Sequence, residues 1–165
     1  MHKALRLVVL TAGLAASALA GPTLACHEWV STPGSVFAAL EPLREFAMGA
    51  YDPGKKEAVR AKLVQLRAEI NPGDPVSLMK AGYWAGVLHA IGVSPDTDGP
   101  ELMLRAAALR PNDAEYEFMA ALAYFDHDKA AFQKHWDRAR QLAQPGSAAA
   151  QNLELFRKIL AERSV

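Results

Sequence analysis

The chain has 165 residues, with 18 lysine and arginine residues against 18 aspartate and glutamate residues. This balance lacks the basic surplus that phosphate backbones require, so we expect no nucleic-acid partner. Its single cysteine, Cys26, cannot form an internal disulfide. A chain of this length makes one domain, large enough for a single continuous core.

Residues 1–25 have the pattern of a secretory signal peptide. Two basic residues precede an apolar run over residues 7–19, and Ala-Leu-Ala ends at Ala20. These features correspond to the n-region, the h-region and a small-residue cleavage site. The run is too short to span ~30 Å of hydrocarbon. We therefore expect export to the periplasm, with cleavage after Ala20 or Ala25.

Cys26 leaves two outcomes of this processing open. Thr-Leu-Ala-Cys over residues 23–26 resembles a bacterial lipobox, although Thr23 stands where that motif usually has leucine. Lipidation of Cys26 would make the protein a membrane-anchored lipoprotein, and we expect no other membrane contact. Ordinary cleavage would leave a single thiol in a lead-in, residues 26–34, that we expect to be flexible.

Residues 35–165 predict a single all-α domain without strands. Apolar residues recur at three- and four-residue steps, and caps, glycines and prolines separate the periodic segments. Pro42 falls inside the first segment and is expected to kink that helix or delay its start. The predicted helices cover about residues 36–48, 55–70, 75–91, 100–109, 113–125, 129–143 and 147–162.

Polar residues at the starts of these helices are predicted N-caps, because their side chains can accept bonds from free backbone N–H groups. The helix over residues 75–91 is apolar almost all round, which predicts a central, buried position. Its two glycines, Gly82 and Gly86, predict close packing against neighbouring helices. The expected N-caps are Ser35, Asp74, Asp128, Ser147 and one of Asn112 and Asp113.

Three prolines mark the ends of successive helix pairs. Pro72, Pro111 and Pro145 follow one another at spacings of about 34–39 residues, which is typical of a helical repeat. A repeat of this length with two helices indicates a stack in which each pair contacts only its neighbours.

The residues within these units resemble the tetratricopeptide repeat (TPR) family. Met103-x-x-Ala106, followed by Pro111, matches the large, small and proline positions of the second helix in a repeat. Trp136-x-x-Ala139 matches the same positions in the next unit, whereas the first unit keeps only the helix pair and the proline. The resemblance implies a right-handed stack of about three antiparallel helix pairs, with the last helix as a cap.

Ligands of that family usually lie on the concave face formed by the first helix of each pair. The resemblance implies a protein–protein interaction adaptor or assembly factor that binds a peptide segment in such a groove. The alternative is that these side chains are core, covered by the first helix pair or by the chain's own residues 30–33. The groove would present Met79, Tyr83, Phe118, Leu122 and Phe125.

A second functional hypothesis uses the loop over residues 92–99, which is longer than most connections within a helix pair. Asp96 and Asp98 would let this loop act as an interaction site, as in an inhibitor or immunity protein of a secreted toxin. The two acids have the spacing that begins a calcium-binding loop, but the remaining ligands of such a loop are absent from the sequence.

The histidines offer little support for catalysis. No H-E-x-x-H, G-x-S-x-G or nucleotide-binding loop is present, so we expect no enzyme activity and no cofactor. His89 is expected to be a hydrogen-bonded interior residue on an apolar helix. His127 and His135, with Asp126 and Asp128 adjacent to the first, make a metal-binding role the third and least favoured hypothesis.

Overall fold

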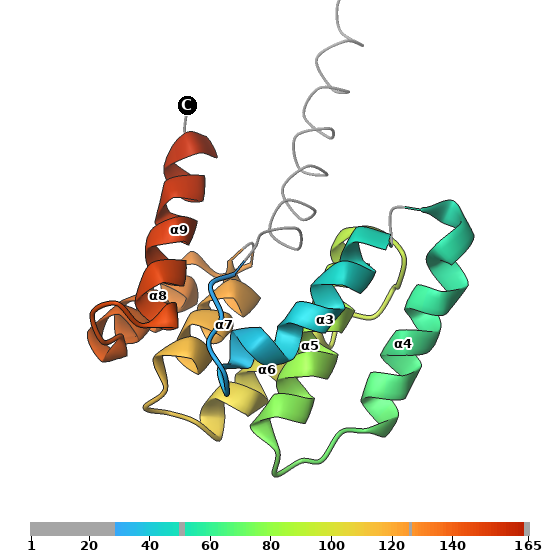
Figure 1. The fold of residues 1–165 in the computed structure, drawn as a ribbon, viewed down its shortest axis with the longest axis horizontal. Helices are drawn as coiled ribbons and strands as arrows, with labels where there is room; N and C mark the ends of the chain where they lie inside the picture. Colours follow the sequence, from blue (N-terminus) through green and yellow to red (C-terminus); the bar gives the residue numbers. More distant parts are fainter. Residues whose placement is uncertain (1–28, 50–51, 126, 164–165) are drawn as a thin grey trace, which may run out of the picture.

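The computed structural model describes residues 29–49, 52–125 and 127–163 (Figure 1). Over these ranges the chain is all-α, with seven α-helices, one short 3-10 helix and no strand. The predicted signal peptide and Cys26 lie outside the described residues, as does Asp126.

Every predicted helix is present, and each end lies within two residues of its predicted position. Chemistry that is local in sequence decides these ends, so they could be predicted without the tertiary structure. The helices are α3 (Val36–Gly49), η1 (Pro53–Lys55), α4 (Lys56–Ala68), α5 (Pro75–Ala90), α6 (Gly99–Ala108), α7 (Ala114–Tyr124), α8 (Lys129–Leu142) and α9 (Ala148–Arg163).

Capping side chains fix the helix starts as predicted. Asp74 accepts bonds from the N–H groups of Val76 and Ser77 at the start of α5, and Asp128 does the same at α8. Asp113, rather than Asn112, caps α7. Such a cap is worth about 1 kcal/mol of stability. The expected delay at Pro42 is not seen, because α3 starts at Val36 and continues through the exposed proline.

The core is centred on α5, as its apolar sequence predicts. Helices α3, α4 and α6 all pack on it, and Trp84 is fully buried among them. The Trp84 indole N–H donates to the carbonyl of Val59 in α4, which satisfies this buried polar group. The closest pairings are α5 with α6 and α7 with α8, whereas α3 and α4 contact each other little.

Close packing at Gly82 is confirmed, and Gly99 is its counterpart on α6. A Cβ atom added to Gly82 would lie 2.8 Å from the carbonyl oxygen of Gly99. A Cβ atom added to Gly99 would lie 2.6 Å from the backbone nitrogen of Gly86. Both distances are below van der Waals contact, so α5 and α6 approach each other closely because these residues lack side chains.

Two residues of the lead-in, Trp29 and Val30, are docked on the fold, although a flexible segment was expected. We call residues 29–33 the strap, drawn in blue beside α7 and α9 in Figure 1. Trp29 is only 6% exposed. The Val30 N–H donates to Asn152 Oδ1 on α9 at 2.7 Å, and Asn152 Nδ2 donates back to the Val30 carbonyl at 2.8 Å. The strap therefore joins the two ends of the described fold.

Candidate functional site

A hollow of about 300 Å³ lies between α5, α6 and α7 and is closed on one side by Trp29. We call it the α5–α7 pocket. Its walls are mostly apolar and are formed by Trp29, Tyr83, Gly86, Val87, Ala90, Pro100, Met103, Leu122 and Ala123. Four polar residues also line it, namely His89, Asp96, Thr97 and His127.

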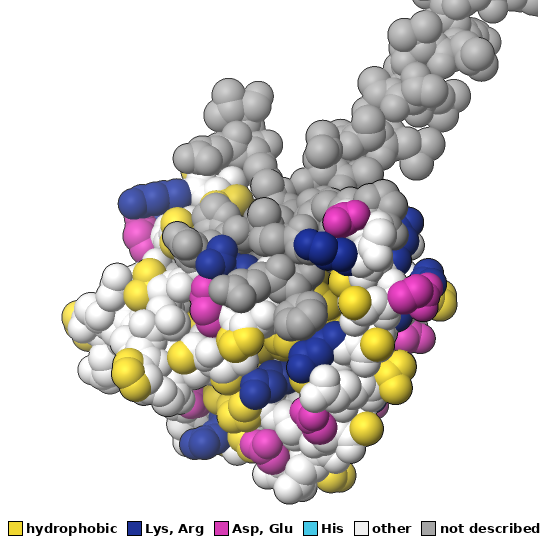
Figure 2. Space-filling view, turned by 45° about the vertical axis from the view of Figure 1, so that its right-hand side comes forward, with side chains coloured by type: hydrophobic (Ala, Val, Ile, Leu, Met, Phe, Trp, Pro, Cys, Tyr) yellow, Lys and Arg dark blue, Asp and Glu magenta, His cyan; other side chains and the backbone are white. Residues whose placement is uncertain are grey.

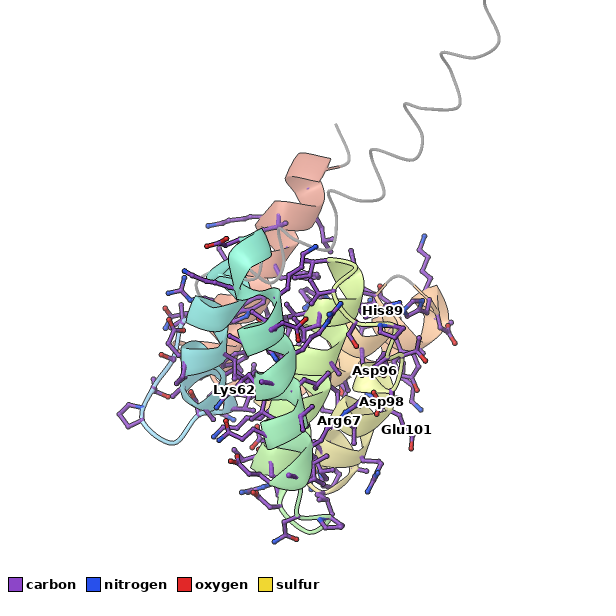
Figure 3. The ribbon with its side chains drawn as sticks, turned by 90° about the vertical axis from the view of Figure 1, so that its right-hand side faces the viewer. Lys62, Arg67, His89, Asp96, Asp98 and Glu101 are labelled. Carbon is purple, nitrogen blue, oxygen red and sulfur yellow. The ribbon has the colours of Figure 1, made fainter. Side chains whose placement is uncertain are left out.

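The polar residues stand at the solvent side of this pocket. His89, Thr97 and His127 are exposed, and Asp96 is half-buried. The expectation that His89 is an interior residue is therefore wrong, because the last two residues of α5, His89 and Ala90, are exposed. Figure 3 shows His89 at the end of α5 and Asp96 in the loop that follows it. An apolar interior with a few polar groups at its mouth is typical of a binding site.

Gly86 keeps this pocket open. A Cβ atom at Gly86 would meet nothing within 4 Å, in contrast to one at Gly82. Glycine in a helix interior costs about 1 kcal/mol relative to alanine. The backbone of Gly86 packs closely against Gly99, but the open space at its own Cβ position needs a further reason. Because Gly86 lines the α5–α7 pocket, the space that its missing side chain leaves belongs to the pocket.

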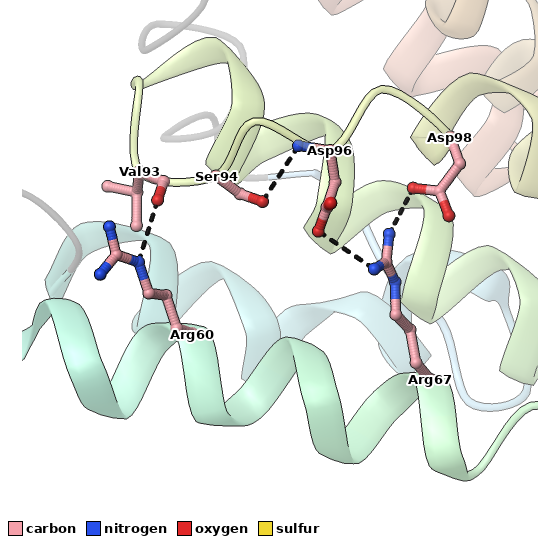
Figure 4. A network of polar contacts seen from close by, with 6 residues as sticks. All are labelled: Arg60, Arg67, Val93, Ser94, Asp96 and Asp98. Carbon is pink, nitrogen blue, oxygen red and sulfur yellow. Dashed lines mark hydrogen bonds and ion pairs between the residues drawn. The ribbon is translucent and has the colours of Figure 1, made fainter.

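Two arginines of α4 hold the loop that borders the pocket (Figure 4). Arg67 pairs with both predicted loop acids, at 3.0 Å from Asp96 Oδ2 and in a shorter contact with Asp98 Oδ1. Arg60 donates from Nε to the carbonyl of Val93 at 3.1 Å. The backbone N–H of Asp96 also donates to Ser94 Oγ. The two carboxylates are thus bound within the protein, and the loop is tied to α4.

The five residues predicted for the groove do not lie in one site. Tyr83 and Leu122 line the α5–α7 pocket. Met79 and Phe118 are fully buried, and Phe125 packs edge-on against Phe132 at a centroid distance of 5.5 Å. Buried side chains cannot reach a ligand in this conformation, so the site is a smaller pocket than the groove implied by the family resemblance.

The chain itself covers Phe118. The sequence left open a cover by the first helix pair or by residues 30–33, and the structure shows Phe37 of that pair together with Trp29, one residue before that range. The ring of Trp29 packs on Phe118 at a centroid distance of 5.5 Å and an interplanar angle of 79°. Phe37 of α3 lies 5.8 Å from the same ring. Strap and first helix together therefore fill the position that a ligand would need.

The histidines of the metal hypothesis lie in different surroundings. His135 Nδ1 is 2.7 Å from Glu117 Oε2, and its ring stacks on Tyr124 at 5.5 Å. His127 instead lines the α5–α7 pocket. Among the residues that the structure describes, no group of three or more His, Cys, Asp and Glu side chains is placed to hold a metal ion.

Helix α7 carries two titratable groups whose pKa values shift because they are partly buried. Burial raises the pKa of Glu115, although the N–H of Val36 donates to its carboxylate at 2.7 Å and opposes the shift. Burial also raises the pKa of Tyr116 to about 12, against the favourable charge of Arg110. Neither group lines the pocket, so both belong to the scaffold around it.

The distribution of charged side chains on the face in Figure 2 does not indicate the chemical class of a partner. On the face in Figure 2, basic and acidic side chains are scattered among apolar ones. Within the described ranges, no helix is long and apolar enough to cross a bilayer.

Sequence reasoning missed the positions of Gly86, Trp29 and His89 in the pocket. The glycine at position 86 was interpreted as close helix packing, which is seen where Gly99 lies against its backbone, and not as the wall of a pocket. Comparison with known protein families, curated proteins and solved structures found no match to this chain.

Proposed function

We propose that the protein is a peptide-binding adaptor or assembly factor of the periplasm or cell envelope. It holds a protein segment by taking one apolar side chain of that segment into the α5–α7 pocket. The observation that carries this proposal is Gly86, a helix-interior glycine whose missing side chain leaves open space in the pocket. Export, and an anchor at Cys26, rest on the sequence pattern of residues 1–26.

The size and lining of the pocket support a side chain as the ligand. A volume of about 300 Å³ is at the lower end of the range for small-molecule sites, so it suits one or two side chains. The walls can bury an apolar group, which yields roughly 25 cal/mol per Å² removed from water. At the mouth, Thr97, His89 and His127 supply hydrogen-bonding groups for the peptide backbone beside it.

A TPR-like arrangement is part of the proposal. The pocket lies between α5 and α7, which are the first helices of the two closely packed pairs. In the TPR family, the first helices of successive pairs form the ligand-binding face. The packing of α5 with α6 and of α7 with α8 supports this arrangement.

Filling the pocket tests the proposal. We would select peptides from a phage-displayed library on the purified protein and measure their affinity for Gly86→Leu, which places an isobutyl group in the open space. We expect selected peptides to share an apolar residue and to bind this variant at least about tenfold more weakly, a loss of 1.4 kcal/mol.

The control is Ala61→Leu, which adds a comparable apolar group to an exposed position on α4. It should leave the affinity of the same peptides unchanged. Selection of no peptide at all, or equal binding to wild type and Gly86→Leu, would rule out the pocket as the binding site.

The toxin-inhibitor alternative would use the loop over residues 92–99. In the structure, Arg67 already binds both of its acids, and a partner would have to replace those contacts. We therefore prefer the pocket to the loop as the binding site.

A further inference from the structure

The strap has the geometry of a bound peptide. Asn152 is 0% exposed, and its side-chain amide makes two hydrogen bonds to the main chain of a single residue, Val30. A side-chain amide that both accepts from an N–H and donates to the C=O of one residue recognises the backbone and is indifferent to its side chain. Main-chain bonding of this kind gives affinity for extended peptides in many recognition modes.

We call the two bonds between Asn152 and Val30 the clamp. Beside the clamp, the protein recognises a side chain. The indole of Trp29 enters a cluster of aromatic rings, edge-on to Phe118 and 6.1 Å from Phe37. Phe118 in turn packs edge-on against Phe156 of α9 at 5.9 Å. The site therefore accepts a large aromatic residue directly before the residue whose backbone Asn152 holds.

Beyond Val30 the strap runs over the surface. Residues 31–34 are exposed, and Gly34 has a φ of 84°, a conformation that glycine adopts without strain. The chain then turns into α3, where Ser35 Oγ accepts from the N–H of Ala38. Release of the strap by rotation at Gly34 would break two bonds, from the Thr32 N–H to Ser35 Oγ and from the Ser35 N–H to the Thr32 carbonyl, and would keep the Ser35 cap of α3.

We propose that the strap is an internal ligand and that a partner's extended peptide, with an aromatic residue at the position of Trp29, replaces it. This inference rests on the proposed peptide-binding function and specifies the partner's chemistry and its regulation. Because the strap is tethered, its effective concentration is on the order of 1 mM, and a partner must compete against it.

Replacement would also change the α5–α7 pocket. Trp29 is one wall of that pocket and at the same time covers Phe118. When the strap leaves, the pocket and the clamp at Asn152 become one continuous surface that includes Phe118. Phe37 of α3 would still pack on the other side of Phe118, so the open form exposes only the side of this ring that Trp29 now covers.

Competition with a peptide of the strap's own sequence tests this inference on the full chain. The probe is acetyl-WVSTPGS-amide, which copies residues 29–35, and the protein is the Trp29→Ala variant. Because the variant's own strap no longer supplies the indole, we expect the peptide to bind it at least about tenfold more tightly than wild type. The control peptide AVSTPGS should bind neither protein. Equal affinity for both proteins, or no binding to Trp29→Ala, overturns the inference.

A measurement on the wild type guards against misfolding of the variant. In ¹⁵N-labelled protein, excess unlabelled peptide should accelerate hydrogen exchange at the Val30 amide at least threefold, since displacement frees this N–H from Asn152. The Trp84 amide in α5 should exchange at an unchanged rate because the core stays folded. No acceleration at Val30 at millimolar peptide overturns the inference.

Different results would contradict the pocket function and the internal-ligand inference. If library peptides lose affinity for Gly86→Leu while the strap peptide binds nothing, the pocket function stands and the internal-ligand inference falls. If the strap peptide binds Trp29→Ala and no library peptide depends on Gly86, the clamp at Asn152 is a binding site and the pocket is not.

Discussion

Gly82 of α5 lies directly against Gly99 of α6, so close that an added Cβ at Gly82 would be 2.8 Å from the Gly99 carbonyl oxygen. The same Cβ would be 2.8 Å from the backbone nitrogen of Met103. Both obstacles are backbone atoms, which cannot rotate away as a flexible side chain can. The α5–α6 pairing therefore depends on the absence of a methyl group.

We predict that Gly82→Ala lowers the free energy of unfolding by about 1–3 kcal/mol, the usual cost of overpacking a core. The matched variant Gly86→Ala should raise it by about 0.4–1 kcal/mol, because its Cβ enters open space and alanine is the better helix former. Urea denaturation monitored by circular dichroism measures both. Equal effects at the two positions would contradict the packing described at Gly82.

The second prediction concerns Asn152. Asn152→Ala removes the groups that bond the N–H and the carbonyl of Val30. If the strap stays in place, the free energy of unfolding should fall by about 1–3 kcal/mol for each buried group left without a partner. Detachment would limit the loss and shift tryptophan emission to the red as Trp29 meets water. Gln141→Ala, at an exposed position on α8, is the control and should change neither quantity. An unchanged unfolding midpoint together with unchanged emission would contradict the role of Asn152.

The third prediction concerns the loop over residues 92–99. Arg67→Lys keeps the positive charge but cannot hold Asp96 and Asp98 with the two arms of a guanidinium. We expect faster hydrogen exchange at the Asp96 amide and a loss of at most about 1 kcal/mol in stability, since the ion pairs are partly exposed. Arg140→Lys, in an exposed pair with Asp137, should leave that exchange unchanged. Identical exchange rates in the two variants would contradict a restraint by Arg67.

The fourth prediction concerns Tyr116. Its pKa is raised to about 12 by burial, so its phenol should remain protonated well above pH 10. Because the folded pKa exceeds the unfolded value of 10.0, the contribution to stability is complete below pH 10 and falls as the pH rises toward 12. Absorbance at about 295 nm follows tyrosinate formation. Tyr116→Phe should remove the step near pH 12 from this titration, and an unchanged titration would contradict the prediction.

The fifth prediction concerns Glu115, whose pKa burial raises above the model-peptide value of 4.5. Its stabilising contribution is complete below that value and declines as the pH rises through the folded pKa. Glu115→Gln retains an oxygen that can accept from Val36 but carries no charge. We therefore expect the variant to gain stability relative to wild type between pH 4 and pH 7. Chemical denaturation at both pH values measures the difference, and a relative loss at pH 7 would contradict the prediction.

The helices and their ends could be predicted from the sequence because their causes are local. A carboxylate such as Asp74 reaches N–H groups two and three residues further along, wherever the rest of the chain lies. The burial of α5 could be predicted for a similar reason, since a helix that is apolar on all sides has to be covered. Close packing at Gly82 could also be predicted, because glycine is unfavourable inside a helix unless packing requires it.

The location of the candidate site could be predicted only in part. The family resemblance identified Tyr83 and Leu122, which both line the α5–α7 pocket. It could not show that Phe118 is covered, because one covering residue, Trp29, belongs to a stretch with no periodic pattern and the other, Phe37, lies on a different helix. Likewise, Asp96 and Asp98 were visible as loop acids, but their partner Arg67 lies on another helix.

By itself, the sequence determined an all-α chain, the positions of its helices and caps, and the close approach at Gly82. Only the tertiary structure decided that Trp29 of the strap covers Phe118, that Gly86 opens onto a pocket and that His89 stands at the mouth of that pocket. The physical reason is sequence separation. Helix caps bridge a few residues, whereas the bonds between Val30 and Asn152 join residues 122 positions apart and form only when the whole stack is assembled.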